Sequence, residues 1–119
     1  MGLPMIRRAI AGAGLLASCH VWASQGSVAT DSKAARRAAN ITRDYRLSKE
    51  KTECLLFDTA DKGSYFLVRV RENHTEACGG MTAVSPAAFF LTIRKRDGYT
   101  LTTAYDSEHY RPLKLRHQR

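Results

Sequence analysis

A short polar segment in the second half of the chain carries the residue types that acid–base chemistry uses. It reads Glu72-Asn73-His74-Thr75-Glu76-Ala77-Cys78-Gly79-Gly80. Glu72, His74 and Glu76 alternate, so they project from one face if the preceding strand continues through them. A carboxylate beside an imidazole raises the pKa of the histidine or orients one tautomer. General acid–base chemistry is therefore the first hypothesis that these residues raise.

Other features of the same segment argue against chemistry of its own. Neither a hydroxyl group nor a second histidine nearby completes a recognisable catalytic relay, so we predict that the protein is not an enzyme. His74 and Cys78 have the spacing of two zinc ligands, but two ligands do not make a site. Gly79-Gly80 lacks the strand and helix context of a phosphate-binding loop. We predict no metal and no cofactor, and the candidate partner-binding residues are Glu72, His74, Glu76, Gly79 and Gly80.

The first 23 residues have the pattern of an export signal. Arg7 and Arg8 form a charged start, residues 9–17 form a short apolar stretch, and Val21-Trp22-Ala23 places small residues at the signal-peptidase positions. The apolar stretch is much shorter than the ~20 residues that cross a bilayer. We therefore expect a signal peptide over residues 1–23, cleavage after Ala23, a periplasmic location and no transmembrane span.

A second pattern in the same segment competes with this cleavage. Leu16-Ala17-Ser18-Cys19 fits the sequence at which bacterial lipoprotein signals are cut and the cysteine is lipidated. In both alternatives Cys19 is unavailable for pairing. The two cysteines that remain are in an oxidising compartment, where disulfides persist. We therefore predict a disulfide between Cys54 and Cys78.

The charge of the chain is strongly basic, with a formal net charge of +8. It stays basic when Arg7 and Arg8 are removed with the signal. The basic side chains are scattered along predicted strands and termini, and an exported domain rarely meets DNA, so we expect no nucleic-acid partner. Solvated surface, attraction to an anionic envelope surface and attraction to an acidic protein are the alternatives.

The remainder of the chain predicts a single α+β domain over residues 31–119, after a flexible linker at residues 24–30. Ala34, Ala38, Ile41 and Tyr45 recur at helical spacing and predict a helix from Ser32 to about Arg46. Alternating apolar residues then predict four strands, at Glu53–Phe57, Ser64–Glu72, Ala88–Arg94 and Tyr99–Tyr105. We expect one N-terminal helix packed on a four-stranded antiparallel sheet, with an irregular tail after Asp106.

Several stretches of the chain resemble a group of small exported proteins of Gram-negative bacteria. Those proteins carry a V-x-E-x-H-x3-C-G-G-like segment followed by Ser-Pro and a strand. The matching stretches here are Cys54–Phe57, Tyr65–His74, Cys78–Gly80 and Ser85-Pro86. Some similar small periplasmic proteins are immunity partners of cell-wall amidase toxins, so the resemblance implies a protein-binding role. Met81 stands where that group usually has an acidic residue.

Together these observations predict an exported periplasmic binding module of inhibitor or immunity type, without catalytic activity, whose partner is a protein of the cell envelope. The binding surface is expected at Glu72–Gly80 or, if the last strand forms the edge of the sheet, at that edge, where the backbone of Thr100, Thr102 and Thr103 can pair with a partner strand. The alternatives are a structural protein of the envelope anchored through Cys19, and a hydrolase that uses His74 and Glu76.

Overall fold

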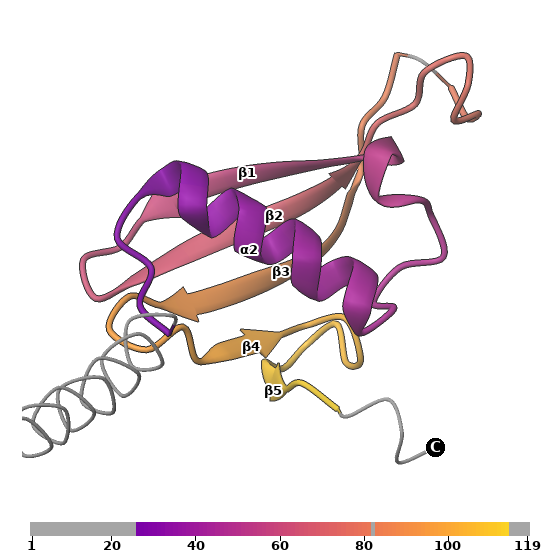
Figure 1. Ribbon diagram of the computed structural model, residues 1–119. Coiled ribbons are helices and arrows are strands. Elements are labelled where there is room, and N and C mark those ends of the chain that lie inside the picture. Colours follow the sequence, from indigo (N-terminus) through magenta and orange to yellow (C-terminus); the bar gives the residue numbers. More distant parts are fainter. Residues whose placement is uncertain (1–25, 82, 115–119) are drawn as a thin grey trace, which may run out of the picture.

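The computed structural model describes residues 26–81 and 83–114, which form an α+β fold (Figure 1). A single antiparallel sheet has its strands in chain order, β1-β2-β3-β4-β5, and the helix α2 crosses one face of it. The elements are α2 (Asp31–Asp44), the short 3-10 helix η1 (Thr52–Cys54), β1 (Leu55–Asp61), β2 (Tyr65–Glu72), β3 (Ala87–Arg94), β4 (Thr100–Thr102) and β5 (Arg111–Pro112).

Helix α2 runs from Asp31 to Asp44, whereas the sequence predicted a range from Ser32 to about Arg46. The Thr30 hydroxyl accepts a hydrogen bond from the backbone N–H of Lys33 at 3.2 Å, which satisfies one of the unpaired donors of the first turn. Ala34, Ala38 and Ile41 are buried on one side of the helix. Two alanines on this face let the helix backbone lie close to the sheet.

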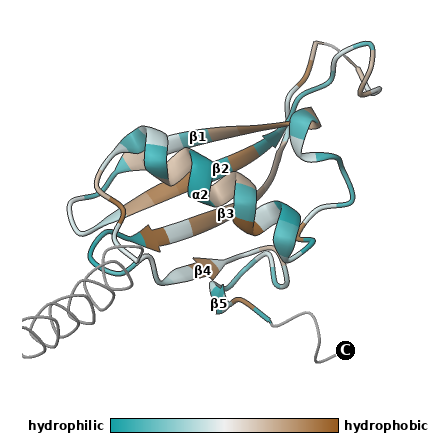
Figure 2. Ribbon diagram, viewed as in Figure 1, coloured by the Kyte–Doolittle hydropathy of each residue, from teal (hydrophilic) through white to brown (hydrophobic). Residues whose placement is uncertain are grey.

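The hydrophobic core fills the space between α2 and the sheet. The paired strands β2 and β3 contribute alternate residues that are buried on the side facing the helix, namely Phe66, Val68, Val70, Phe89, Leu91 and Ile93. Hydrophobic residues are accordingly concentrated on the strands beneath α2 (Figure 2). This alternation is that of an antiparallel sheet with one covered face.

The segment predicted to be a flexible linker, residues 24–30, is packed where the structure describes it. Val28 is buried in the core, and its backbone N–H donates to the carbonyl of Lys95 at 2.7 Å. Gly26 lies so close to the turn after β3 that a Cβ atom would be 2.9 Å from the carbonyl oxygen of Asp97. One apolar side chain in a polar segment is enough to attach it to the core, so the linker prediction is wrong for residues 26–30.

The sheet has five strands, and the prediction of four is wrong. The fifth strand, β5, forms from the tail that was expected to be irregular. It is only two residues long and includes Pro112, which is tolerated at a sheet edge because an edge residue needs no N–H partner on its outer side. β4 is shorter than predicted, since it ends at Thr102 rather than at Tyr105.

The first strand also differs from its predicted range. The chain makes the turn η1 before it enters the sheet, and β1 then continues to Asp61, through residues that were expected to form a turn. Asp58 sits within the strand because its carboxylate pairs with Arg69 and Arg71 on β2. A charged residue inside a strand is stable when a cross-strand partner neutralises it.

No helix in the described part of the chain is long and apolar enough to span a membrane. The predicted signal peptide, residues 1–23, and the lipidation candidate Cys19 lie outside the described residues.

Replacement of Val28 by alanine tests the packing of residues 26–30. We expect Val28→Ala to lower the free energy of unfolding by about 2 kcal/mol, because it empties a buried site in the core. The matched control is Ala29→Ser at the exposed neighbouring position, which should change stability by less than about 0.5 kcal/mol. Urea denaturation of the purified protein measures both. Equal stability of the two variants contradicts a packed Val28.

Candidate functional site

The loop between β2 and β3, described over residues 73–81 and 83–86, projects away from the end of the sheet (Figure 1). We call it the projecting loop. It holds four of the five residues predicted to bind a partner, and the fifth, Glu72, is the last residue of β2 beside it. The structure therefore brings the predicted candidates to one end of the molecule.

A disulfide holds the middle of the projecting loop to the body of the domain. Cys54 and Cys78 are bonded as predicted, with their Cα atoms 5.6 Å apart. Because the bridge closes a covalent ring of about 25 residues, the chain-entropy model assigns it a stabilisation of about 3.5 kcal/mol. The bond is compatible with a location outside the cytoplasm. It also means that Cys78 is not a thiolate available to a metal beside His74.

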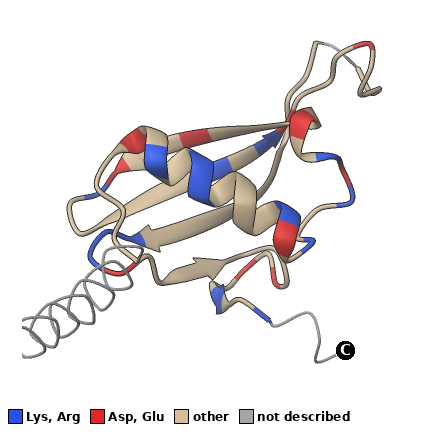
Figure 3. Ribbon diagram, viewed as in Figure 1, with Lys and Arg blue, Asp and Glu red and all other residues tan. Residues whose placement is uncertain are grey.

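The base of the projecting loop is fastened by hydrogen bonds to both strands that flank it. The Ser85 hydroxyl donates to the carbonyl of Glu72 at 2.6 Å, and it accepts a hydrogen bond from Nη1 of Arg71 at 2.7 Å. Arg71 is itself held by the carboxylate of Asp58 on β1. Figure 3 shows acidic residues on β1 and basic residues on the neighbouring strand β2. This pairing lowers the pKa of Asp58 below its ordinary value. Asp58, Arg71 and Ser85 thus form a clamp across the loop base.

His74 bridges the two ends of the projecting loop. Its Nε2 lies 2.5 Å from the carboxylate of Glu72, and its Nδ1 lies 2.9 Å from the carbonyl oxygen of Met81. Only 16% of the His74 side chain is exposed. A carbonyl oxygen and an ionised carboxylate only accept hydrogen bonds, so the ring satisfies both partners when both nitrogens carry a proton. The bridge is therefore built for the imidazolium form.

The electrostatics of the bridge agree with its geometry. The hydrogen bond to Glu72 is the largest cause of a raised His74 pKa, followed by the hydrogen bond to the Met81 carbonyl. Partial burial acts in the opposite direction, and the nearby charge of Glu50 adds a small increase. The arrangement is that of a charged group holding two acceptors together.

The three alternating residues do not share one surface as a continued strand would place them. β2 ends at Glu72, so Glu76 lies in a turn and is exposed, whereas His74 folds back towards Glu72. Glu72 and Met81 occupy both ring nitrogens of His74 in this conformation. The geometry is thus better suited to positioning the loop than to proton transfer with a substrate.

The two glycines of the projecting loop have different roles. Both adopt a left-handed backbone, with φ of +82° at Gly79 and +82° at Gly80, a conformation that glycine adopts most readily. A Cβ atom on Gly80 would also lie 2.7 Å from Cγ of the His74 ring, whereas one on Gly79 would meet nothing within 4 Å. Gly80 is therefore required by the His74 bridge as well as by the turn.

The second half of the projecting loop exposes two large apolar side chains that sequence reasoning did not assign to the site. Met81 is 69% exposed and Val84 is 46% exposed. The backbone N–H of Val84 donates to the carbonyl of Met81 at 3.2 Å, so both residues belong to one turn. The available signal was a cluster of apolar residues in a segment rich in glycine and turn-forming residues, where no strand or helix could bury them.

The alternative binding surface, the edge of the last predicted strand, is not free. β5 pairs with β4, opposite Leu101 and Thr102. The Thr100 and Thr102 side chains are buried on the helix side of the sheet. The condition of that prediction, that the fourth strand forms the edge of the sheet, is therefore not met at Leu101 and Thr102.

Within residues 26–81 and 83–114, no group of three or more His, Cys, Asp or Glu side chains is placed to hold a metal ion.

Comparison of the chain with protein-family models, with curated proteins and with solved structures finds no match.

A pair of glycine substitutions separates the close approach at Gly80 from the backbone conformation. Both Gly79→Ala and Gly80→Ala place a side chain in a left-handed conformation, which costs about 1 kcal/mol. Gly80→Ala in addition displaces the His74 ring. We expect Gly80→Ala alone to shift the NMR signals of the His74 ring strongly and to lower stability more than Gly79→Ala does. Identical effects of the two substitutions contradict the close contact.

The His74 bridge predicts a pH-dependent loop. Because the folded-state pKa of His74 is raised above its unfolded value of about 6.5, the stabilisation is complete below about pH 6.5 and is lost as pH rises through the folded-state pKa. NMR titration of the ring should give a midpoint above about 6.5, and Glu72→Gln should lower that midpoint.

The control for this titration is Glu76→Gln, the same substitution two residues on the other side of His74. Glu76 is exposed in the turn, so its replacement should leave the His74 midpoint nearly unchanged. An equal response to both substitutions would show that the bridge to Glu72 does not set the titration.

Proposed function

We propose that the protein is an exported periplasmic binding module of inhibitor or immunity type, and that it acts by inserting the projecting loop into a concave site of a protein in the cell envelope. In this proposal the protein has no catalytic activity of its own. The observation that carries it is the pair of exposed apolar side chains, Met81 and Val84, in the projecting loop, whose conformation is fixed by a disulfide and by hydrogen bonds.

The restraints support binding because they remove a cost of association. A flexible loop loses conformational entropy when a partner immobilises it, whereas a loop that is already ordered loses little. Here the Cys54–Cys78 disulfide, the His74 bridge and the hydrogen bonds of Ser85 each fix a different part of the loop. Inhibitors that bind in a preformed conformation change shape little on binding.

The exposed side chains support the proposal because apolar surface is more stable when a partner removes it from water. Met81 and Val84 are two of the four large hydrophobic side chains that are most exposed in the described part of the chain. Apolar side chains that fill a partner pocket at the centre of an interface add to its binding energy, and methionine, which is enriched there, adapts well to pockets of irregular shape. Polar residues, among them Glu76, lie next to them and are suited to the rim.

Capture from envelope extract tests this proposal. The immobilised protein should retain one protein in stoichiometric amount, and Met81→Asp and Val84→Asp should each lose it, because a carboxylate cannot enter an apolar pocket unpaired. The matched control is Ala29→Asp, which places the same charge at an exposed position outside the projecting loop and should retain the protein.

The retained protein, once purified, allows the affinity to be measured. We expect Met81→Asp to weaken binding at least tenfold, or about 1.4 kcal/mol. Retention of the same protein by all variants would place the interface elsewhere on the molecule. Failure of the unchanged protein to retain anything above background would refute a binding module with an envelope partner.

A further inference from the structure

The sheet has a second large surface, on the side turned away from α2. Because side chains alternate along each strand, the residues between the core positions of β1 to β4 project there. Their apolar members are only half-buried, and they are Leu56, Tyr65, Leu67, Phe90 and Leu101. We call this surface the open face. Within the described residues, no helix covers it.

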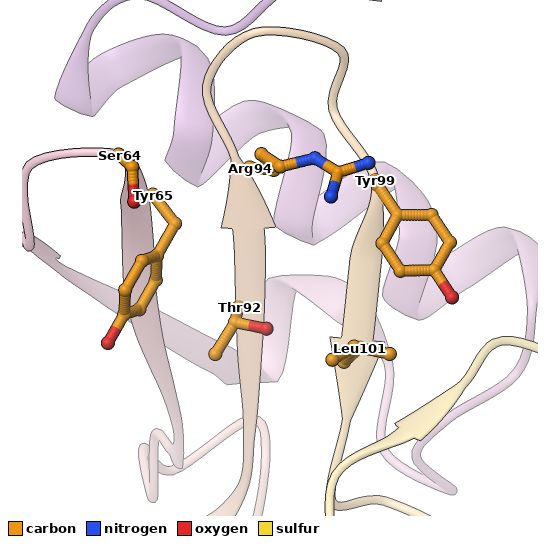
Figure 4. Close-up of a pocket in the computed structure, with 6 residues that line it drawn as sticks. All are labelled: Ser64, Tyr65, Thr92, Arg94, Tyr99 and Leu101. Carbon is orange, nitrogen blue, oxygen red and sulfur yellow. The ribbon is translucent and has the colours of Figure 1, made fainter.

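A shallow pocket of about 240 Å³ lies on the open face, across β2, β3 and β4. Its lining is shown in Figure 4 and consists of Ser64, Tyr65, Thr92, Arg94, Tyr99 and Leu101. Tyr65 and Tyr99 stand on either side of Thr92, which forms part of the floor, and Arg94 lies at one end. The volume is below the ~300–1,000 Å³ of typical small-molecule sites. It suits a single side chain of a larger ligand.

Arg94 is held in a fixed orientation at the end of this pocket. Its Nε and Nη2 donate to the two carboxylate oxygens of Asp97 at 2.9 and 2.7 Å, and its Cζ lies 5.0 Å from the centre of the Tyr99 ring. The ion pair uses one edge of the planar guanidinium, so the donors on Nη1 lie outside it. An arginine that is already oriented loses little entropy when it binds a carboxylate.

The charges on and beside the open face give it a positive excess. Arg69 and Arg71 share the single carboxylate of Asp58 near the end of β2, and Arg94 and Arg96 share that of Asp97 in the turn after β3. Each of these clusters therefore carries one positive charge that its own aspartate does not neutralise. Arg69 and Arg96 are 52% and 77% exposed. Clusters of this kind attract acidic surfaces.

We propose that the open face is a docking surface for an acidic protein segment, which places an aromatic side chain between Tyr65 and Tyr99 and a carboxylate against Arg94. Offset or edge-to-face contacts with tyrosine rings stabilise an aromatic side chain by about 0.5–1.5 kcal/mol beyond the area buried. The carboxylate gains a charge-assisted hydrogen bond to a positioned guanidinium. This surface is separate from the projecting loop and does not depend on the function proposed for it.

NMR titration with short peptides tests this inference. The probe is acetyl-Glu-Phe-Glu-amide, compared with acetyl-Gln-Phe-Gln-amide and acetyl-Lys-Phe-Lys-amide. We expect the acidic peptide to shift the amide signals of Tyr65, Thr92 and Leu101, and to bind at least tenfold more tightly than the other two. The difference in affinity between the peptides should shrink at 0.5 M salt, because the Debye screening length is then only about 4 Å.

Four variants make the result specific. Arg94→Glu should weaken binding of the acidic peptide at least tenfold, and Tyr99→Ser, at a half-exposed position, should weaken it severalfold without loss of the fold. The matched control is Arg36→Glu on the exposed side of α2, which makes the same charge change and should leave binding intact. Met81→Asp should also leave it intact, which separates this test from that of the projecting loop.

Three outcomes overturn the inference. Equal affinity for the three peptides removes the role of charge. NMR shifts confined to α2 or to the projecting loop, or no shifts at millimolar peptide, would show that the peptide does not bind the open face. Sedimentation of the protein with phosphatidylglycerol vesicles, without a response to the acidic peptide, assigns the positive excess to a membrane surface instead.

Discussion

The packing of one helix against one face of the sheet is the interaction on which the rest of the structure depends. Ala34 and Ala38 are completely buried, so the backbone of α2 lies close to the strands and the larger side chains of β2 and β3 fill the core. A sheet that is covered by a helix on one face alone can form from a short chain. In so small a domain, no helix of the described residues covers the other face of the sheet, and other contacts hold the ends of the strands.

The parts of this fold that could be predicted are those that repeat. The helical spacing of Ala34, Ala38 and Ile41 and the alternation along β2 and β3 appear in the sequence because each repeat places its side chains against one core. Val28 and β5 were missed for the opposite reason. A single apolar residue in a polar segment and a two-residue strand have no period, and both are ordered by contacts with residues distant in the sequence.

The candidate site, like the fold, could be predicted only in part. Cysteine pairing followed from the count of cysteines and the expected compartment, and the position of Glu72 and His74 in one segment followed from their order. The bridge from His74 to the Met81 carbonyl could not be predicted, because it depends on two glycines turning the chain back by conformations that no spacing reveals. The exposure of Met81 is a result of that turn.

The projecting loop is closed by two cross-links of different chemical nature. One is the covalent bond between Cys54 and Cys78, whose existence depends on the thiol–disulfide potential of the surroundings. The other is the pair of hydrogen bonds that the His74 imidazolium donates to Glu72 and to the Met81 carbonyl, and the population of that charged form depends on pH. The shape of the loop is thus coupled both to the redox potential and to the pH of its surroundings, through two residues of one loop, His74 and Cys78.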